Sequence, residues 1–559
     1  MSLNDAREKF PGWPTNHSTD QSPITVVNMP LRRSNSVISK TFSETISLPG
    51  LSRAIQTRSI LERFFWIIVF LSTTGMFTWQ IVELFLRFSS YPKKVTVEVL
   101  PMKVEFPSIS VCNMRHLDIE ILNSLNGVFK SNKSLIEQID DYDNPFIKAY
   151  IRKSAVYATL FSPYQEKYPD VFQEIFSRTT YSANIDESVI ETAVVKFDQF
   201  FVTSSMSSTK CDRSEYSSFF DPYYYRCFTY NGKSQSFAEG IENGWLAIIL
   251  SGSGMTYKNN EVRVIPGLQQ SRSPVSASDG VRVIIHPENT TPFPFTEGYD
   301  VPPNFSASFA IRARKNIRIG PPHGLCTNTN PFSPDSKKKY RVIECQRMCV
   351  QRKILDECNC LDSSYPLLAN TSAKFCRQDD IFPEICAVEA NAECMDIMLK
   401  AYERIKCSQR VQRSVLINAT SIFDQCFCYP ACNETSYDVS YSLSKWPTPT
   451  YESDSTFVEI FLLENFTMPS KKINFMDEIK YEERQKIMKE FLRLNVYVAD
   501  SNVMKTEESP EYTINQLVSD IGGQAGLWVG MSVITLAEVI SVLCSLFNTS
   551  DKYKKRRNP

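Results

Sequence analysis

The chain has 559 residues with 61 Lys or Arg and 62 Asp or Glu, so its formal net charge is −1 and nothing indicates a nucleic-acid partner. Its length allows about two to four domains. The four histidines are too scattered for a zinc or catalytic cluster, and no HExxH, GxSxG or phosphate-loop motif is present. We therefore expect no metal, no cofactor and no enzymatic activity.

The first 63 residues are polar, rich in Ser, Asn and Pro, and lack the pattern of a cleavable signal peptide. We expect this segment to be cytoplasmic and disordered up to about residue 47. Residues 64–82 carry no charge, and the apolar stretch continues past Glu83. A run of this length predicts a first transmembrane helix over residues 64–88.

The cysteines cluster in one part of the chain. All of them except Cys544 lie between Cys112 and Cys432, which predicts a disulfide framework in an oxidising compartment. The odd number in that region leaves at least one thiol free or paired between chains. The close pairs at 358–360 and 426–428 favour disulfides over metal ligation, since no histidine is near. Seven Asn-x-Ser/Thr sequons also indicate an extracellular domain: Asn132, Asn289, Asn304, Asn370, Asn418, Asn433 and Asn465.

Two segments alternate apolar and polar residues with the period of a half-buried strand. One follows the first span and contains Val95, Val97 and Val99. The other is expected to lead back to the membrane and contains Leu492, Leu494, Val496 and Val498. We expect both strands to share one sheet that connects the extracellular domain to both membrane helices.

A second apolar stretch, residues 521–547, carries one charge, Glu538, and predicts a second transmembrane segment over residues 513–547. Three glycines recur every four residues and share one helix face: Gly522, Gly526 and Gly530. This face is typical of helix dimerisation, or of a pore-lining helix with Asp520 at its mouth and residues 530–532 in its narrow part. A carboxylate at membrane depth is expensive, so we expect Glu538 to face a wet vestibule.

Basic residues precede the first span and fill the tail at residues 548–559. Because basic flanks stay in the cytoplasm, both termini are predicted to be cytoplasmic and residues 89–512 extracellular. The sequence thus predicts an α+β plasma-membrane protein with two transmembrane helices and a large disulfide-rich extracellular domain.

Four features carry a family resemblance: FPSISVCN at 106–113, the cysteine order over 326–432, SDIGGQAGLW at 519–528, and the G-x-S triplet at 530–532. Together they resemble the degenerin/epithelial sodium channel/acid-sensing ion channel superfamily, over about residues 47–550. The resemblance implies a homo- or heterotrimer whose subunits contain a palm, a knuckle, a finger (about 113–226), a thumb (about 326–432) and a β-ball. It also implies sodium-selective conduction and block by amiloride.

The resemblance assigns roles in and near the second span. Asp520, with Ser519 and Gly523, corresponds to the outer pore gate, and Ser519 falls where a bulky side chain props such channels open. The selectivity filter would consist of Gly530, Met531 and Ser532. Asp520 as a helix N-cap and Met531 as a packing residue remain alternatives. In the cytoplasmic gating motif at residues 47–51, Gly50 is kept and proline replaces the histidine.

The family's cysteine order implies the disulfides Cys112–Cys227, Cys326–Cys432, Cys345–Cys428 and Cys349–Cys426. It also pairs Cys358 and Cys360 with Cys376 and one of Cys386, Cys394 or Cys407, a choice that the sequence leaves open. Cys211 lacks the neighbour that it would bridge.

The activating stimulus differs among members of the superfamily. His323 stands where acid-sensing channels carry a tryptophan, with Tyr91 as the candidate aromatic partner, so it is a candidate proton sensor or, more commonly, a packing histidine. Proton gating also needs opposed carboxylates, for which the candidates are Asp140, Asp141 and Asp143 against Asp379, Asp380 and Glu384.

Aromatic residues gather in the expected finger beside these acids, which suits a short basic, aromatic peptide ligand. They are Tyr142, Phe146, Tyr150, Tyr157, Phe161, Tyr164, Tyr168 and Phe172. We therefore expect an invertebrate FMRFamide-type peptide-gated sodium channel, with a proton-gated or constitutively open channel as the alternative. A trimeric ATP-gated channel would lack the motif at 519–528, and a non-conducting receptor would not need the glycine face.

Overall fold

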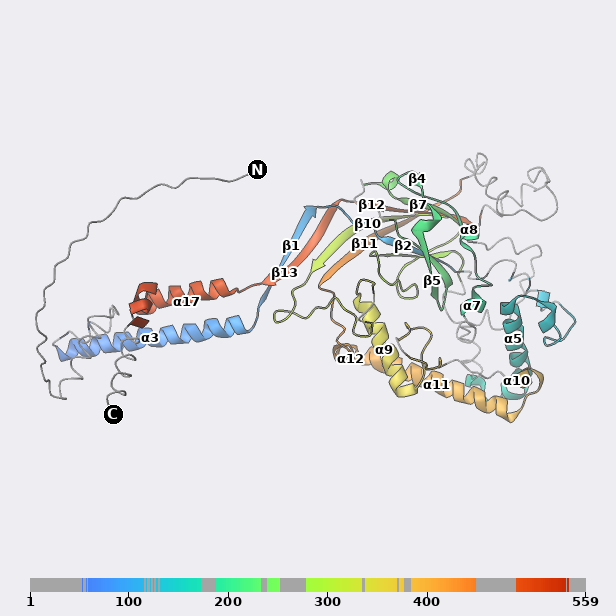
Figure 1. Cartoon of the computed structure of the whole chain (residues 1–559), viewed down its shortest axis with the longest axis horizontal. Coiled ribbons are helices and arrows are strands. Elements are labelled where there is room, and N and C mark those ends of the chain that lie inside the picture. Colours follow the sequence, from blue (N-terminus) through green and yellow to red (C-terminus); the bar gives the residue numbers. More distant parts are fainter. Residues whose placement is uncertain are drawn as a thin grey trace, which may run out of the picture. The chain divides into compact units, whose positions relative to one another are not determined.

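The computed structural model divides into two compact units, Met1–Pro92 with Tyr512–Pro559 and Lys93–Glu511 (Figure 1). It describes residues 53, 57, 59–114, 117, 121, 124, 127–128, 131–171, 187–232, 239–251, 278–333, 337–368, 371–376, 384–448, 489–538 and 540–541. Gly50, Asn370, Asn465 and Cys544 lie outside these ranges.

The first unit contains helix α3, Ile60–Ser89, which includes the whole of the expected span 64–88. By length and composition, it is the one helix among the described residues that is long and apolar enough to cross a membrane. Half-buried residues recur every three or four positions along it, at Thr73, Phe77, Gln80 and Leu84. Helix α17, Ile514–Val529, packs against α3.

The larger sheet of the second unit has eight strands and carries β1, Lys93–Pro101, and β13, Asn502–Pro510, at one edge. The two pair antiparallel along their whole length. The long strand β10, Phe305–Ile317, pairs on one side with β11 and on the other with β12 and β13. The other strands are β3 Phe201–Met206, β4 Thr209–Lys210, β7 Trp245–Leu250, β11 Asn433–Lys445 and β12 Phe491–Val498.

The expectation that the two alternating strands share one sheet is confirmed, because β1 and β12 both belong to it. The expectation that β12 leads back to the membrane is wrong: the chain turns after β12 and adds β13, whose sequence NVMKTEESP has no apolar alternation. Val95, Val97 and Val99 are 52%, 59% and 61% exposed rather than half-buried. They lie on an edge strand, and no second layer covers them among the described residues.

The smaller sheet has five antiparallel strands in the order β5 Tyr216–Asp221, β6 Tyr225–Tyr230, β2 Ser108–Asn113, β8 Val281–His286 and β9 Tyr299–Val301. It packs on the larger sheet through a shared core, in which Ile109 of β2 meets side chains such as Phe309 of β10 and Leu494 of β12. All six residues of β2 are buried, which explains the apolar character of the motif at 106–113.

Helices flank the two sheets. The expected finger contains α5 Pro145–Tyr164, α7 Glu187–Ile190 and α8 Phe197–Phe200. The expected thumb contains α9 Val342–Cys358, α10 Glu384–Val388, α11 Ala392–Ile417 and α12 Ala419–Gln425. Short 3-10 helices lie at η1 Ile139–Asp141, η3 Arg213–Glu215 and η4 Ile241–Asn243. Helix α9 packs on α11, and α10 packs on α5, so the thumb tip contacts the finger.

Disulfides hold the thumb and close the smaller sheet. The structure pairs Cys112–Cys227, Cys326–Cys432, Cys345–Cys428, Cys349–Cys426, Cys358–Cys407, Cys360–Cys376 and Cys386–Cys394. Of the three candidate partners that the sequence left open, Cys407 pairs with Cys358. The other two, Cys386 and Cys394, pair with each other. Cys211 is a buried free thiol whose pKa burial raises to about 11. The chain is an α+β protein with many disulfides and a helix suited to span a membrane.

Candidate functional site

Helix α17 begins with a capping box. Thr513 Oγ1 accepts a hydrogen bond from the Gln516 backbone N at 3.3 Å, and Gln516 Oε1 accepts one from the Thr513 backbone N at 2.8 Å. The N-cap is therefore Thr513, and the alternative that Asp520 caps this helix is wrong, because Asp520 lies in its second turn.

The two faces of α17 differ in what covers them. Leu517 and Ala525 are buried, and Gln524 and Trp528 are half-buried, on the face that packs against α3. At 100° per residue, Ser519, Gly522, Gly523 and Gly526 lie on the opposite face, and all four are exposed. A Cβ added at Gly522 or Gly523 would meet no atom within 4 Å. The glycine face is thus not used for packing on α3 and is exposed among the described residues.

Asp520 is exposed in the N-terminal half of α17, beside the glycine face. Its Oδ2 accepts a hydrogen bond of 2.6 Å from the Tyr512 hydroxyl, and the Arg87 guanidinium lies 5.3 Å from the centre of the Tyr512 ring. The Tyr512 hydroxyl therefore orients the Asp520 carboxylate.

Asp520→Asn is expected to lower conductance without lowering surface expression. In the trimer that the family resemblance implies, three unit charges at about 10 Å in water would attract a cation by about 1 kcal/mol in total, a roughly fivefold local enrichment. Single-channel recording should show a lower conductance for Asp520→Asn than for wild type at low ionic strength. This difference should shrink as the salt concentration rises, because salt screens the charges. Tyr512→Phe removes the hydrogen bond but keeps the charge, so it serves as the control. Equal conductance of Asp520→Asn and wild type at low salt would contradict the role.

The helix breaks at the triplet 530–532. Gly530 has φ 68° and ψ 23°, a left-handed conformation that ends α17, and the Met531 backbone N donates to Ala525 O at 3.1 Å. Ser532 then starts a new helical segment: its Oγ accepts from the Thr535 N, and its own N donates to Thr535 Oγ1, both at 3.2 Å. Irregular backbone at membrane depth is tolerated only where protein or a water-filled cavity surrounds it. The expected filter residues thus coincide with the break.

Glu538 lies in the helical segment after the break. Its Oε2 is buried and has no hydrogen-bond partner among the described residues. The expectation that Glu538 faces a wet vestibule stays a prediction.

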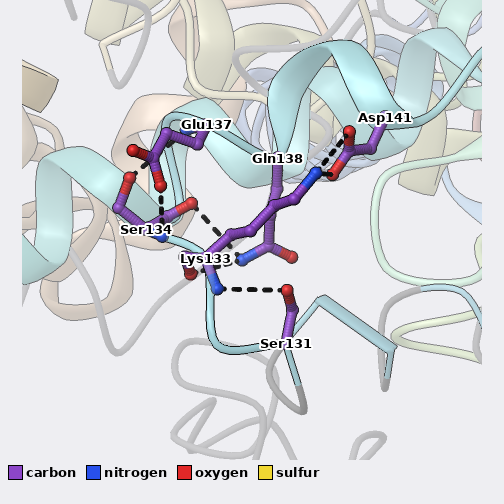
Figure 2. Close-up of polar contacts among 6 residues, drawn as sticks. All are labelled: Ser131, Lys133, Ser134, Glu137, Gln138 and Asp141. Carbon is purple, nitrogen blue, oxygen red and sulfur yellow. Dashed lines mark hydrogen bonds and ion pairs between the residues drawn. The ribbon is translucent and has the colours of Figure 1, made fainter.

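Of the acidic run expected to take part in proton sensing, Asp141 is paired with a lysine. Asp141 accepts two hydrogen bonds from Lys133 Nζ, at 3.0 and 2.9 Å (Figure 2). In the turn between these two residues, the Ser134 backbone N donates to Glu137 Oε2 and the Glu137 backbone N donates to Ser134 Oγ. Asp379, Asp380 and the side chain of Glu384 lie outside the described residues.

His286, which the sequence did not single out, lies in a buried polar network of the smaller sheet. Its Nε2 is 2.9 Å from Ser110 Oγ, and its Nδ1 is 3.0 Å from Thr290 Oγ1. Burial, aided by the charge of Arg341, lowers the pKa of His286 from 6.5 to about 4. The sequence does not reveal the burial of this histidine, since Ser110, the partner of its Nε2, lies 176 residues away in the chain.

Acid is expected to destabilise this sheet through His286. The folded pKa lies below the unfolded value, so unfolding takes up a proton between pH 6.5 and about 4 and the free energy of unfolding falls as pH falls, by up to about 3 kcal/mol. The thermal midpoint of purified protein should drop from pH 7.5 to pH 5, and His286→Gln should reduce that drop. An identical pH dependence in His286→Gln would contradict the assignment.

The finger aromatics divide into core and surface. Phe146 and Tyr150 are buried in the finger core, whereas Tyr157, Tyr164 and Tyr168 are half-exposed where α5 meets the thumb. A cavity of about 60 Å³ lies beside the finger core that contains Phe146 and Tyr150. It is lined by Ile190, Glu191, Val194, Ser218, Phe219, Phe220 and Arg226. It has room for a few water molecules and is too small for an aromatic side chain.

The described sequons lie at the surface of the second unit: Asn132, Asn289, Asn418 and Asn433 are exposed, and Asn304 is half-buried. His323 is also half-buried, next to the Pro321–Pro322 peptide.

Comparison with known proteins gives a consistent result. The family model described as "Amiloride-sensitive sodium channel" matches residues 42–542. The FMRFamide-activated amiloride-sensitive sodium channel of Cornu aspersum is 27% identical over 89% of this chain and 81% of its own length. Degenerin-like protein asic-2 of Caenorhabditis elegans is 25% identical, over 90% and 86%. The epithelial sodium channel subunit alpha of Mus musculus is 22% identical, over 90% and 74%.

Proposed function

Since this chain belongs to the amiloride-sensitive sodium channel family, a family of membrane ion channels and not of enzymes, we propose that it forms a trimeric, sodium-selective channel opened by an extracellular ligand. The observation that carries the proposal is the break at Gly530, in a helix whose glycine face is open. Three such helices can converge on a common axis at the glycines, because no side chain holds their backbones apart.

In this arrangement the second span is the pore. Asp520, with Ser519 and Gly523, forms the outer gate, and sodium passes the narrow ring formed by Gly530, Met531 and Ser532. Ser532 and the backbone carbonyls freed by the break offer oxygen to a partly dehydrated ion. Both helices span the plasma membrane, both termini are cytoplasmic, and Lys93–Glu511 is the extracellular part, with palm, knuckle, finger, thumb and β-ball.

The ligand that we propose is a short amidated peptide of the FMRFamide type. Support comes from the name of the Cornu aspersum relative and from the half-exposed tyrosines Tyr157, Tyr164 and Tyr168. Aromatic surface beside acids suits a basic, aromatic peptide. Proton gating is the alternative; of its candidate carboxylates, Asp141 forms an ion pair with Lys133.

Whole-cell recording from cells that express this chain alone tests the proposal. A sodium current evoked by amidated peptides, absent with the same peptides ending in a free carboxylate and blocked by amiloride, is the expected result. An acid-evoked current would replace the peptide with protons as the stimulus. A steady current without stimulus would mean a constitutively open channel. Failure of this surface-expressed chain to conduct alone or with related subunits would contradict the proposed function.

A further inference from the structure

Trp528 lies between two glutamine side chains in the membrane unit. Its indole N–H points to Gln80 Oε1 of α3 at 2.5 Å and to Gln524 Oε1, one turn earlier on α17, at 3.0 Å. All three side chains are half-buried, and α17 lies alongside α3 (Figure 1). A tryptophan N–H can only donate, so both amides must turn their oxygens toward it.

This contact lies two residues before Gly530, where helix α17 ends. Gly526 and Gly530 are each two residues from Trp528, and Gly526 therefore points about 160° away from it around the helix axis. A bond that fixes Trp528 toward α3 thus also fixes the glycine face away from α3. Within a bilayer, water does not replace a lost hydrogen-bond partner, so only protein groups can satisfy the indole N–H.

We infer that Trp528 is a positioning residue for the pore, which through Gln80 sets the rotation of α17 and so presents its glycine face to the ion path. The inference rests on the proposed channel function. Loss of the bond allows α17 to rotate on α3, which changes the balance of open and closed states and the geometry at Gly530. Hydrogen bonds between membrane helices are worth about a threefold change in an equilibrium, and we expect an effect of this size.

A double-mutant cycle on the full-length chain tests the inference. Trp528→Phe keeps the aromatic ring and removes the donor, and Gln80→Leu removes the acceptor. Each is combined with Ser519→Cys, so that basal current can be compared with current after modification by a positively charged thiol reagent. Thermal midpoints of the detergent-purified proteins give a readout that needs no conduction. Trp79→Phe is the matched control, because Trp79 is 63% exposed on the same helix as Gln80.

Each single variant should shift the ratio of basal to reagent-locked current about threefold, and Gln80→Leu should add nothing to Trp528→Phe, which already lacks the donor for both glutamines. Their losses in thermal midpoint should be non-additive in the same way, and Trp79→Phe should change neither readout. Additive losses would overturn the hydrogen bond, and an unchanged current ratio with a lowered midpoint would overturn the positioning role. If wild type and all variants carry no current, the proposed function fails, and the midpoints still decide whether the bond couples the helices.

Discussion

Replacing Gly530 with valine is expected to abolish the sodium current or its selectivity while the protein still reaches the cell surface. Gly530 has φ 68°, a conformation that costs a residue with a Cβ about 1 to 2 kcal/mol in each subunit, and more when the side chain is β-branched. The substitution also adds bulk where the proposed trimer brings three backbones together. Recording of the reversal potential in mixed sodium and potassium solutions, with surface biotinylation in parallel, measures both effects.

The matched control for Gly530→Val is Gly75→Val, because a Cβ at Gly75 of α3 meets no atom within 4 Å and its backbone is helical. Gly530→Asn is the second control, since asparagine tolerates the left-handed region, and it should retain more current than valine. Full current and an unchanged reversal potential in Gly530→Val would place the narrow part of the pore elsewhere.

Modification of Ser519→Cys with a positively charged thiol reagent is expected to lock a large current on. Ser519 is exposed on the α17 face opposite α3, so the reagent can reach it, and the added bulk and charge would keep the three outer ends apart. Three like charges at one mouth also repel one another. Whole-cell current before and after the reagent, followed by a reducing agent, measures the effect.

Val518→Cys is the matched control for Ser519→Cys. Val518 is 65% exposed but lies about 100° away around the helix, so its modification should change the current little. Equal changes in current for Val518→Cys and Ser519→Cys would show that the effect of the reagent does not depend on the helix face. An unchanged current in modified Ser519→Cys would contradict the assignment of Ser519 to the gate.

Sequence reasoning reached the features that depend on local pattern. The uncharged run at 64–82 lies within α3, and the spacing of Gly522 and Gly526 placed them on one face of α17, whereas Gly530 ends that helix instead of continuing its face. Strand β13 was missed because its exposed residues do not alternate, and the exposure of Val95 was misjudged because period alone does not show whether a second layer covers a strand. The bond from Trp528 to Gln80 depends on how two helices are rotated against each other, which no local pattern encodes.

The pairing of β1 with β13 has a practical consequence. Lys93 and Pro510 are direct antiparallel partners, so the two ends of Lys93–Glu511 lie about 5 Å apart. Chain ends this close can be joined by a linker of a few residues, and such joins are tolerated where termini meet at a surface. Residues 93–511 are therefore suited to be produced without the membrane helices as a cyclised or circularly permuted protein, on which binding of the proposed ligand can be measured apart from conduction.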